Sequence, residues 1–525
     1  MSRLESSIRN IKFSILGQAL GILINLISRK IFVSFLSIEY LGLNGLFSNI
    51  LSMLTLAELG IGTAIIYSLY RPIAEDNKNE IKSLMRLYKY VYCSVGCFIL
   101  AAGSLLAPFL NLFIKDMPDI THIRLIYLIF VANSAVSYFF TYKRSLIIAT
   151  QKQYLVTVYH YGLMILLNFE QIIALYITQS FIIYLLLQTI NTFLENILLS
   201  KKADKLYPYL CEHNIMPLKK EVKTTIKRNV FAMVFHRIGG VLVFATDNIL
   251  ISKIVGLTAV GLYSNYIIIR QALNTITGQL FQSISASFGN LNASGSDEHK
   301  LEIFYVMHFA GAWIFGFCSI CFFNLVNPFI ELWLGKEYLF SIDIIFWITL
   351  AFYLTGMRQA SLTVRDAMGL FWYDRYKPIF EIIVNIFASI ILGKKYGVAG
   401  IMAGTVISTL ATCFWIEPYV VYKYGFHTSI KAYFQKYALY SFITLICAVL
   451  TTYLCSFTAS FGIYALIVKF VICVIIPNLL YLLCYRTTNE LHYIITVAKI
   501  FMPLKLQLVV PKKNEKFNNS RYKQK

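Results

Sequence analysis

The stretch from 461 to 485, FGIYALIVKFVICVIIPNLLYLLCY, decides the fold class of this protein. It contains one charged residue, Lys469, and exceeds the ~20 apolar residues that a helix needs to cross the hydrocarbon core of a bilayer. Comparable runs recur along all 525 residues, which are 58% hydrophobic and 14% charged, with a mean hydropathy of +0.65. A soluble domain averages ~25% charged residues, so the sequence predicts an all-α integral membrane protein.

The apolar runs predict about fourteen transmembrane helices, with approximate bounds 13–36, 40–67, 87–111, 123–147, 155–176, 180–200, 229–252, 261–288, 303–326, 343–369, 378–396, 398–422, 437–456 and 461–485. One long polar segment separates the sixth run from the seventh and divides the chain. The predicted organisation is therefore a lobe of six spans, a connecting loop, a second lobe of six spans, a final pair of helices and a basic tail, at 1–200, 201–228, 229–422, 423–485 and 486–525.

The distribution of basic residues predicts the orientation in the membrane. If the N-terminus is cytoplasmic, the connections alternate, and the cytoplasmic segments hold most of the 47 Lys and Arg, chiefly in the loop after span six and in the tail. Such an inside excess is the positive-inside rule. The net charge of +21 is therefore explained mostly by the basic residues of the cytoplasmic segments rather than by nucleic-acid binding. Both ends of the chain are expected in the cytoplasm. The first ten residues are polar and no cleavable signal is expected.

A short internal repeat crosses the central loop. Residues 35–44, FLSIEYLGLN, resemble residues 254–263, IVGLTAVGLY, with Gly42 and Gly261 in register. A weaker third copy surrounds Gly400. Repeated halves of like orientation are typical of transporters whose binding site lies between two lobes. A tight hairpin that requires glycine is the alternative explanation.

Charged residues inside the apolar runs are the candidates for a site, because burying a charge at the bilayer centre costs ~2.5–3.5 kcal/mol on insertion scales. The candidate substrate-binding residues are Arg29, Arg237, Arg270, Arg358 and Arg365; the candidates for coupling or charge balance are Glu58, Asp247 and Asp366. Arginine suits a phosphate group because its planar fork binds oxygens in pairs and keeps its charge. The alternative is structural, with Arg–Asp and Arg–Glu pairs that lock helices together.

Motifs for enzymatic chemistry are missing from the sequence. It contains no Walker, HExxH or GxSxG motif, and the predicted outer loops are short. Cys318 and Cys321 form a CxxC inside an apolar run without a second pair at zinc spacing. We therefore expect no catalytic residues, no metal and no cofactor.

Five stretches resemble the polysaccharide-transporter (Wzx-like) flippases of the multidrug/oligosaccharidyl-lipid/polysaccharide (MOP) exporter superfamily. They are RKIFVSFLSIEYLGLNGLFSNIL at 29–51, LAELGIGTA at 56–64, SLYRPIA at 68–74, TDNILISK at 246–253 and AVGLY at 259–263. The resemblance extends to about residue 425. It implies two six-helix lobes in a V, as in MATE and other MOP transporters, with two further C-terminal helices and alternating access.

The resemblance also implies a cargo and a location. The cargo would be a polyprenyl-diphosphate-linked oligosaccharide, moved to the outer leaflet of a bacterial cytoplasmic membrane for capsule, O-antigen or a similar surface polymer. Arg29 is the matching cavity arginine, and Arg270 and Arg358 follow from placement. A polysaccharide polymerase and glycosyltransferases would be partners. A lipid II flippase, a MATE-like drug or organic-cation antiporter, and a membrane glycosyltransferase or polymerase remain the alternatives.

Overall fold

The computed structural model describes residues 3–58, 60–212, 245–458 and 462–501, together with 217, 218, 222, 224 and 226. All regular elements in this part of the chain are helices. The N-terminal half contains α1 (Arg3–Phe35), α2 (Ile38–Leu54), α3 (Ile61–Ala74), α4 (Lys78–Leu106), α5 (Ile123–Phe139), α6 (Tyr142–Ala149), α7 (Gln153–Thr178) and α8 (Phe181–Leu206). Short 3₁₀ turns η1 (Thr55–Glu58) and η3 (Pro208–Cys211) follow α2 and α8.

The C-terminal half begins, within the described residues, with helical residues 245–254. It continues through α10 (Leu257–Ser294), α11 (Asp297–Trp333), α12 (Ile342–Met357), α13 (Gln359–Ala367), α14 (Lys377–Ser408), α15 (Phe414–Val420), α16 (Lys431–Ser456), α17 (Ile463–Tyr485) and α18 (Asn489–Phe501). The predicted all-helical, multi-span class is confirmed.

Nine helices in the described residues are long and apolar enough to span a membrane, or ten if α5 and α6, bent by 47°, are one span. One of the nine, Lys377–Phe426, covers two predicted spans and folds back at Gly397, whose φ is 59°. Part of the predicted span 229–252 lies outside the described residues. The total of fourteen therefore stays a prediction.

One predicted span is wrong, and the predicted tail contains an unexpected helix. The expected span 40–67 is broken, since α2 ends at Leu54 and α3 starts after Gly60, which has a left-handed φ of 75° that favours glycine. The expected tail 486–525 also contains a helix, α18, whose 13 residues separate apolar from polar faces. Neither feature is visible in hydropathy alone, because both depend on local backbone geometry and amphipathic periodicity.

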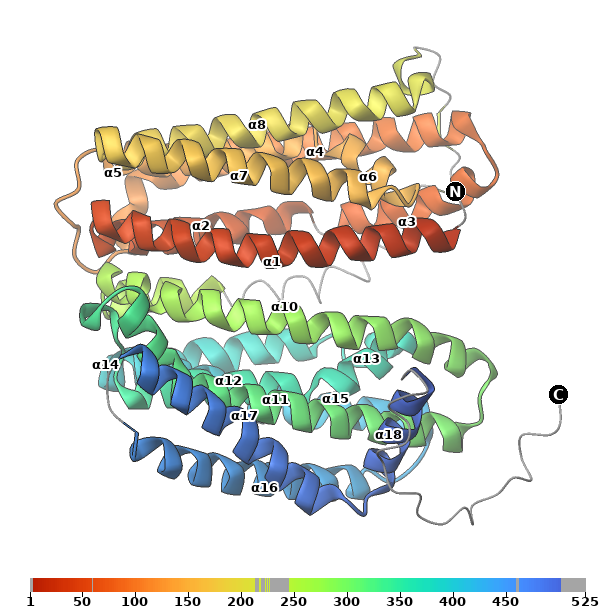
Figure 1. Ribbon diagram of the computed structural model, residues 1–525. Helices are drawn as coiled ribbons and strands as arrows, with labels where there is room; N and C mark the ends of the chain where they lie inside the picture. Colours follow the sequence, from red (N-terminus) through yellow and green to blue (C-terminus); the bar gives the residue numbers. More distant parts are fainter. Residues whose placement is uncertain are drawn as a thin grey trace.

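The two halves form separate helical bundles (Figure 1). In Figure 1 α1–α8 lie above α10–α18, and the bundles approach each other where α1 passes into α2 and α10 begins. They diverge towards the end that carries the N-terminus. Each half has its own apolar core, and Leu257 of α10 joins a core of the N-terminal half. Large apolar side chains such as Leu105 and Phe387 are exposed, as expected for surfaces that face lipid.

Helices α2 and α10 pack against each other through the two glycines of the internal repeat. A Cβ at Gly42 would lie 2.2 Å from the carbonyl oxygen of Leu257, and one at Gly261 would lie 2.5 Å from that of Ile38. Both glycines lie within the first turns of their helices rather than in the preceding turns. They are required by close helix packing, not by a tight hairpin.

Candidate functional site

We call the contact of residues 38–45 with residues 257–264 the seam. Arg29 of α1 lies beside it and donates a hydrogen bond from Nη1 to Oγ of Ser264, at 3.1 Å. Trp333 of α11 donates from Nε1 to the carbonyl oxygen of Leu26, at 3.0 Å. Hydrogen bonds from both halves therefore join them beside the seam.

Further hydrogen bonds join the halves at the same end. Thr258 donates to Oε1 of Glu39 at 3.3 Å, and the Lys115 amide donates to the carbonyl oxygen of Ser252 at 3.2 Å. Lys253 Nζ also donates to a backbone carbonyl of the N-terminal half. These five hydrogen bonds all lie around one end of the interface between the halves. The protein is therefore closed at the seam.

A recess of about 650 Å³ adjoins the seam. Its lining combines the start of α2, the loop 116–120 and the start of α10, and it includes the carboxylates of Glu39, Asp116 and Asp119. The recess lining therefore carries three carboxylates, while Lys115 and Lys253 lie close by and Arg29 lies further along α1.

Arg270 and Asp247 form the second polar feature of the C-terminal half near the seam. Asp247 is 3% exposed and accepts a hydrogen bond from Thr405 Oγ1 at 3.1 Å. Arg270 lies within electrostatic reach of Asp247, and its Nε is buried without a hydrogen-bond partner among the described residues. Among those residues, no ion pair joins Arg29 or Arg270 to a carboxylate.

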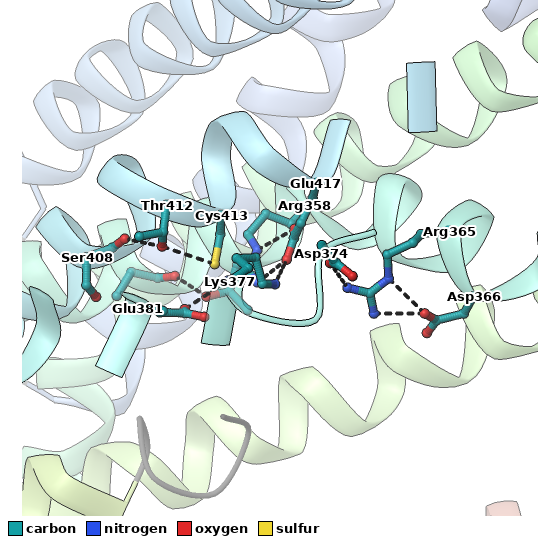
Figure 2. Close-up of polar contacts among 12 residues, drawn as sticks. Arg358, Arg365, Asp366, Asp374, Lys377, Glu381, Ser408, Thr412, Cys413 and Glu417 are labelled. Atoms are coloured by element: carbon teal, nitrogen blue, oxygen red, sulfur yellow. Dashed lines mark hydrogen bonds and ion pairs between the residues drawn. The ribbon is translucent and has the colours of Figure 1, made fainter. Parts of the chain in front are cut away.

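Arg358, in contrast, lies in a buried ion-pair cluster that Figure 2 shows. Its Nε and Nη2 donate to the two carboxylate oxygens of Glu417 at 2.9 and 2.6 Å, and its Nη1 lies 3.7 Å from Glu381. Lys377 also contacts Glu417. We call Arg358, Lys377, Glu381 and Glu417 the C-half cluster; its two cations and two anions balance.

Arg365 is likewise paired. Its Nη1 lies 2.6 Å from Asp374, which is fully buried, and its Nη2 lies 2.8 Å from Asp366 (Figure 2). Asp366 is more than half exposed, so it is not a buried coupling group. For Arg358 and Arg365 the geometry favours the structural alternative, in which the arginines lock helices together.

The remaining predicted residues are separated from these groups. Arg237 lies outside the described residues. Glu58 lies in η1 of the N-terminal half, where it accepts a hydrogen bond from Tyr92 at 2.5 Å. The structure thus brings Arg29 to the seam and Arg270 to Asp247, and it places Glu58 elsewhere.

Glu58 lines a polar pocket of about 340 Å³ inside the N-terminal half. Arg144, His160 and Glu195 share this pocket, and Glu195 Oε atoms lie 3.5 Å from Arg144 and 3.2 Å from His160. Glu195 was missed by the sequence analysis, although a carboxylate within the predicted span 180–200 was the available signal.

Comparisons with solved structures identify the architecture. The lipid II flippase MurJ in an inward closed conformation matches with a TM-score of 0.65 at 15% identity, over 91% of this chain and 99% of that one. An inward-facing MATE-family multidrug transporter of the MOP superfamily matches with a TM-score of 0.61 at 16% identity, over 77% and 94%. The chain has the fold of the MOP-superfamily transporters.

An outward-facing MATE-family transporter of that superfamily also matches, with a TM-score of 0.55 at 14% identity, over 79% of this chain and 95% of that one. No protein-family model matches the chain, and a search of curated proteins found no match. The neighbours with the MOP fold are transporters rather than enzymes, and their low identity establishes the fold alone.

Proposed function

We propose that this protein is a flippase that moves a polyprenyl-diphosphate-linked oligosaccharide from the cytoplasmic to the outer leaflet. The observation that carries the proposal is which of the intramembrane arginines are paired with a carboxylate. Arg29 and Arg270 come from different halves, and among the described residues neither forms a contact ion pair with a carboxylate, whereas Arg358 and Arg365 do. A guanidinium group without a contacting carboxylate suits an anionic diphosphate.

The same charges weigh against one alternative. An organic-cation antiporter of MATE type needs an acidic and aromatic cavity, and Arg29 and Arg270 would repel its substrate. A lipid II flippase carries a diphosphate cargo too, and the structural likeness to MurJ keeps that alternative open. In both alternatives the likeness favours a lipid-linked cargo. The sequence stretches at 29–51 and 246–263 favour the polysaccharide branch.

We propose alternating access as the mechanism, with the seam as the outer gate. Closure at the seam leaves the site open towards the cytoplasmic side, where the cargo enters. Opening of the seam then exposes the cargo to the outer side. The carboxylates of the outer recess, Glu39, Asp116 and Asp119, would repel the diphosphate and favour its departure.

Two carboxylates are proposed for charge balance and coupling. Asp247 is buried beside Arg270, so it offsets that charge when the site is empty. Glu58 lies in a pocket with Arg144, His160 and Glu195, where a proton or cation can be exchanged. Moving one charge through 100 mV is worth ~2.3 kcal/mol, which can drive transport without nucleotide hydrolysis.

Replacement of Arg29 tests the proposal. Arg29→Ala should abolish export of lipid-linked oligosaccharide, and Arg29→Lys should restore part of it, because the charge returns without the bidentate fork. Export is measured in a deletion strain as the fraction of lipid-linked oligosaccharide that remains in the cytoplasmic leaflet. Arg124→Ala is the matched control, since Arg124 is exposed at the start of α5.

The outcome separates the alternatives. Full export by Arg29→Ala at a normal protein level would refute the role of Arg29. If Arg29→Ala abolished lipid II translocation and left oligosaccharide export intact, the lipid II alternative would be favoured. Loss of activity in Arg124→Ala as well would show that the assay responds to any lost charge.

A further inference from the structure

A basic pocket lies at the start of α4, apart from the seam and from the polar pocket around Glu58. Its volume is about 190 Å³, and its lining includes four basic side chains and two tyrosines, namely Lys82, Arg86, Lys89, Lys143, Tyr90 and Tyr142. Three of the basic residues lie on α4 at spacings of four and three, which places them on one face of the helix. Lys143 is contributed by α6.

The charges of this pocket are only partly neutralised. Lys82, 6% exposed, pairs with Glu212 at 2.9 Å, and Lys143 contacts both carboxylate oxygens of Asp204 at 2.7 and 2.6 Å. Arg86 and Lys89 are exposed, and among the described residues neither forms an ion pair with a carboxylate. An excess of positive charge therefore remains at the mouth of the pocket.

The pocket also adjoins the start of an apolar helix segment. The apolar part of α4 follows directly after Lys89, and Tyr90 is 58% exposed at this transition. Tyrosine is enriched at the boundary between headgroups and hydrocarbon. The Arg86 guanidinium carbon lies 5.7 Å from the centre of the Tyr90 ring, so the ring and the charge lie side by side in the lining of the pocket.

We propose that this pocket binds the phosphate of an anionic phospholipid from the surrounding bilayer. Arg86 and Lys89 would contact the phosphate, while the Lys82–Glu212 and Lys143–Asp204 pairs keep the floor of the pocket neutral. Basic pockets between helices at the membrane surface suit anionic headgroups. Tyr90, Tyr142 and Leu210 add apolar surface that a free phosphate ion does not need but a glycerol backbone can use. The site is separate from the cargo site proposed around Arg29 and Arg270.

Lipid binding to the purified full-length protein tests the proposal. The protein in detergent is titrated with phosphatidylglycerol or phosphatidylcholine, and bound lipids are counted by native mass spectrometry. Phosphatidylglycerol should bind preferentially, and Arg86→Glu with Lys89→Glu should weaken its binding about tenfold or more. Lys201→Glu with Lys205→Glu changes the charge equally at exposed positions of α8 outside the pocket and should leave binding unchanged.

Two further probes identify the source of the phosphate group. Inorganic pyrophosphate tests a free anion, and farnesyl diphosphate tests a cargo-like lipid. The assignment to phospholipid would be overturned if either probe displaced phosphatidylglycerol and bound the pocket of Arg86 and Lys89 with the same affinity as that lipid. An equal loss in both double variants would overturn it as well, since it would indicate general charge attraction. No transport is measured, so failure here leaves the proposed cargo untouched.

Discussion

Gly42 has no room for a side chain. A Cβ at this position would meet the carbonyl oxygen of Leu257 at 2.2 Å, and this neighbour is backbone that cannot rotate away. Gly42→Ala should therefore disfavour the closed seam by about 1–3 kcal/mol, the usual cost of overpacking. Spin labels on the two halves should report a shift towards separated outer ends.

Gly278→Ala on α10 is the control for this prediction, because a Cβ there meets nothing within 4 Å. It should leave the distance distribution unchanged. If Gly42→Ala also leaves the distribution unchanged, the seam is not the element that holds the outer side closed.

The elements α13, α14 and α15 depend on the C-half cluster. Glu417 is fully buried and contacts both Arg358 and Lys377, so Glu417→Gln leaves buried positive charge unbalanced. Breaking a buried pair in this way typically costs ~3–5 kcal/mol. We expect a clear loss of thermal stability, measured as the fraction of protein that stays monodisperse after heating.

A charge-balanced variant checks the physical reason. Arg358→Met combined with Glu417→Met removes one cation and one anion and leaves Lys377 beside Glu381, so it should recover most of the stability. Glu75→Gln breaks the exposed pair with Arg71 and should have little effect. Equal losses in the single and the double variant would show that charge balance is not the cause.

At the scale of the whole molecule, transport should require the two halves to separate at the seam. Glu39→Cys with Thr258→Cys places one thiol on each side of the seam, at positions whose native side-chain oxygens are hydrogen-bonded at 3.3 Å, in a chain whose ten native cysteines have been replaced. Oxidation should lock the seam and stop export, and reduction should restore it. Undiminished export with the seam demonstrably cross-linked would exclude alternating access.

The orientation of the molecule is a second prediction at this scale. Reporter fusions at Asn292 and Tyr373 should both report cytoplasm, because the predicted cytoplasmic segments carry most Lys and Arg. An outer signal at either site would contradict the topology. Asn292 lies in the last turn of α10, and Tyr373 lies between α13 and α14.

Whether a feature of the fold or the site could be predicted from the sequence depends on how far apart along the chain the interacting residues lie. Hydropathy is a local property, so the helical membrane class and most spans could be predicted. The internal repeat aligned Gly42 with Gly261, so the sequence already indicated that these glycines occupy equivalent positions in the two halves. The break at Gly60 and helix α18 were missed, because backbone geometry and amphipathic faces escape a count of apolar residues.

The roles of the charged residues depended on tertiary structure. Arg29, Arg270, Arg358 and Arg365 all appear in sequence as charges at depth. Whether each is paired depends on carboxylates that lie far along the chain, such as Glu417 for Arg358, 59 positions away. The sequence by itself determined that this is a multi-span helical membrane protein with two related halves. Only the tertiary structure decided which arginines are neutralised and which glycines hold the halves together, because both depend on distances between helices that are remote in sequence.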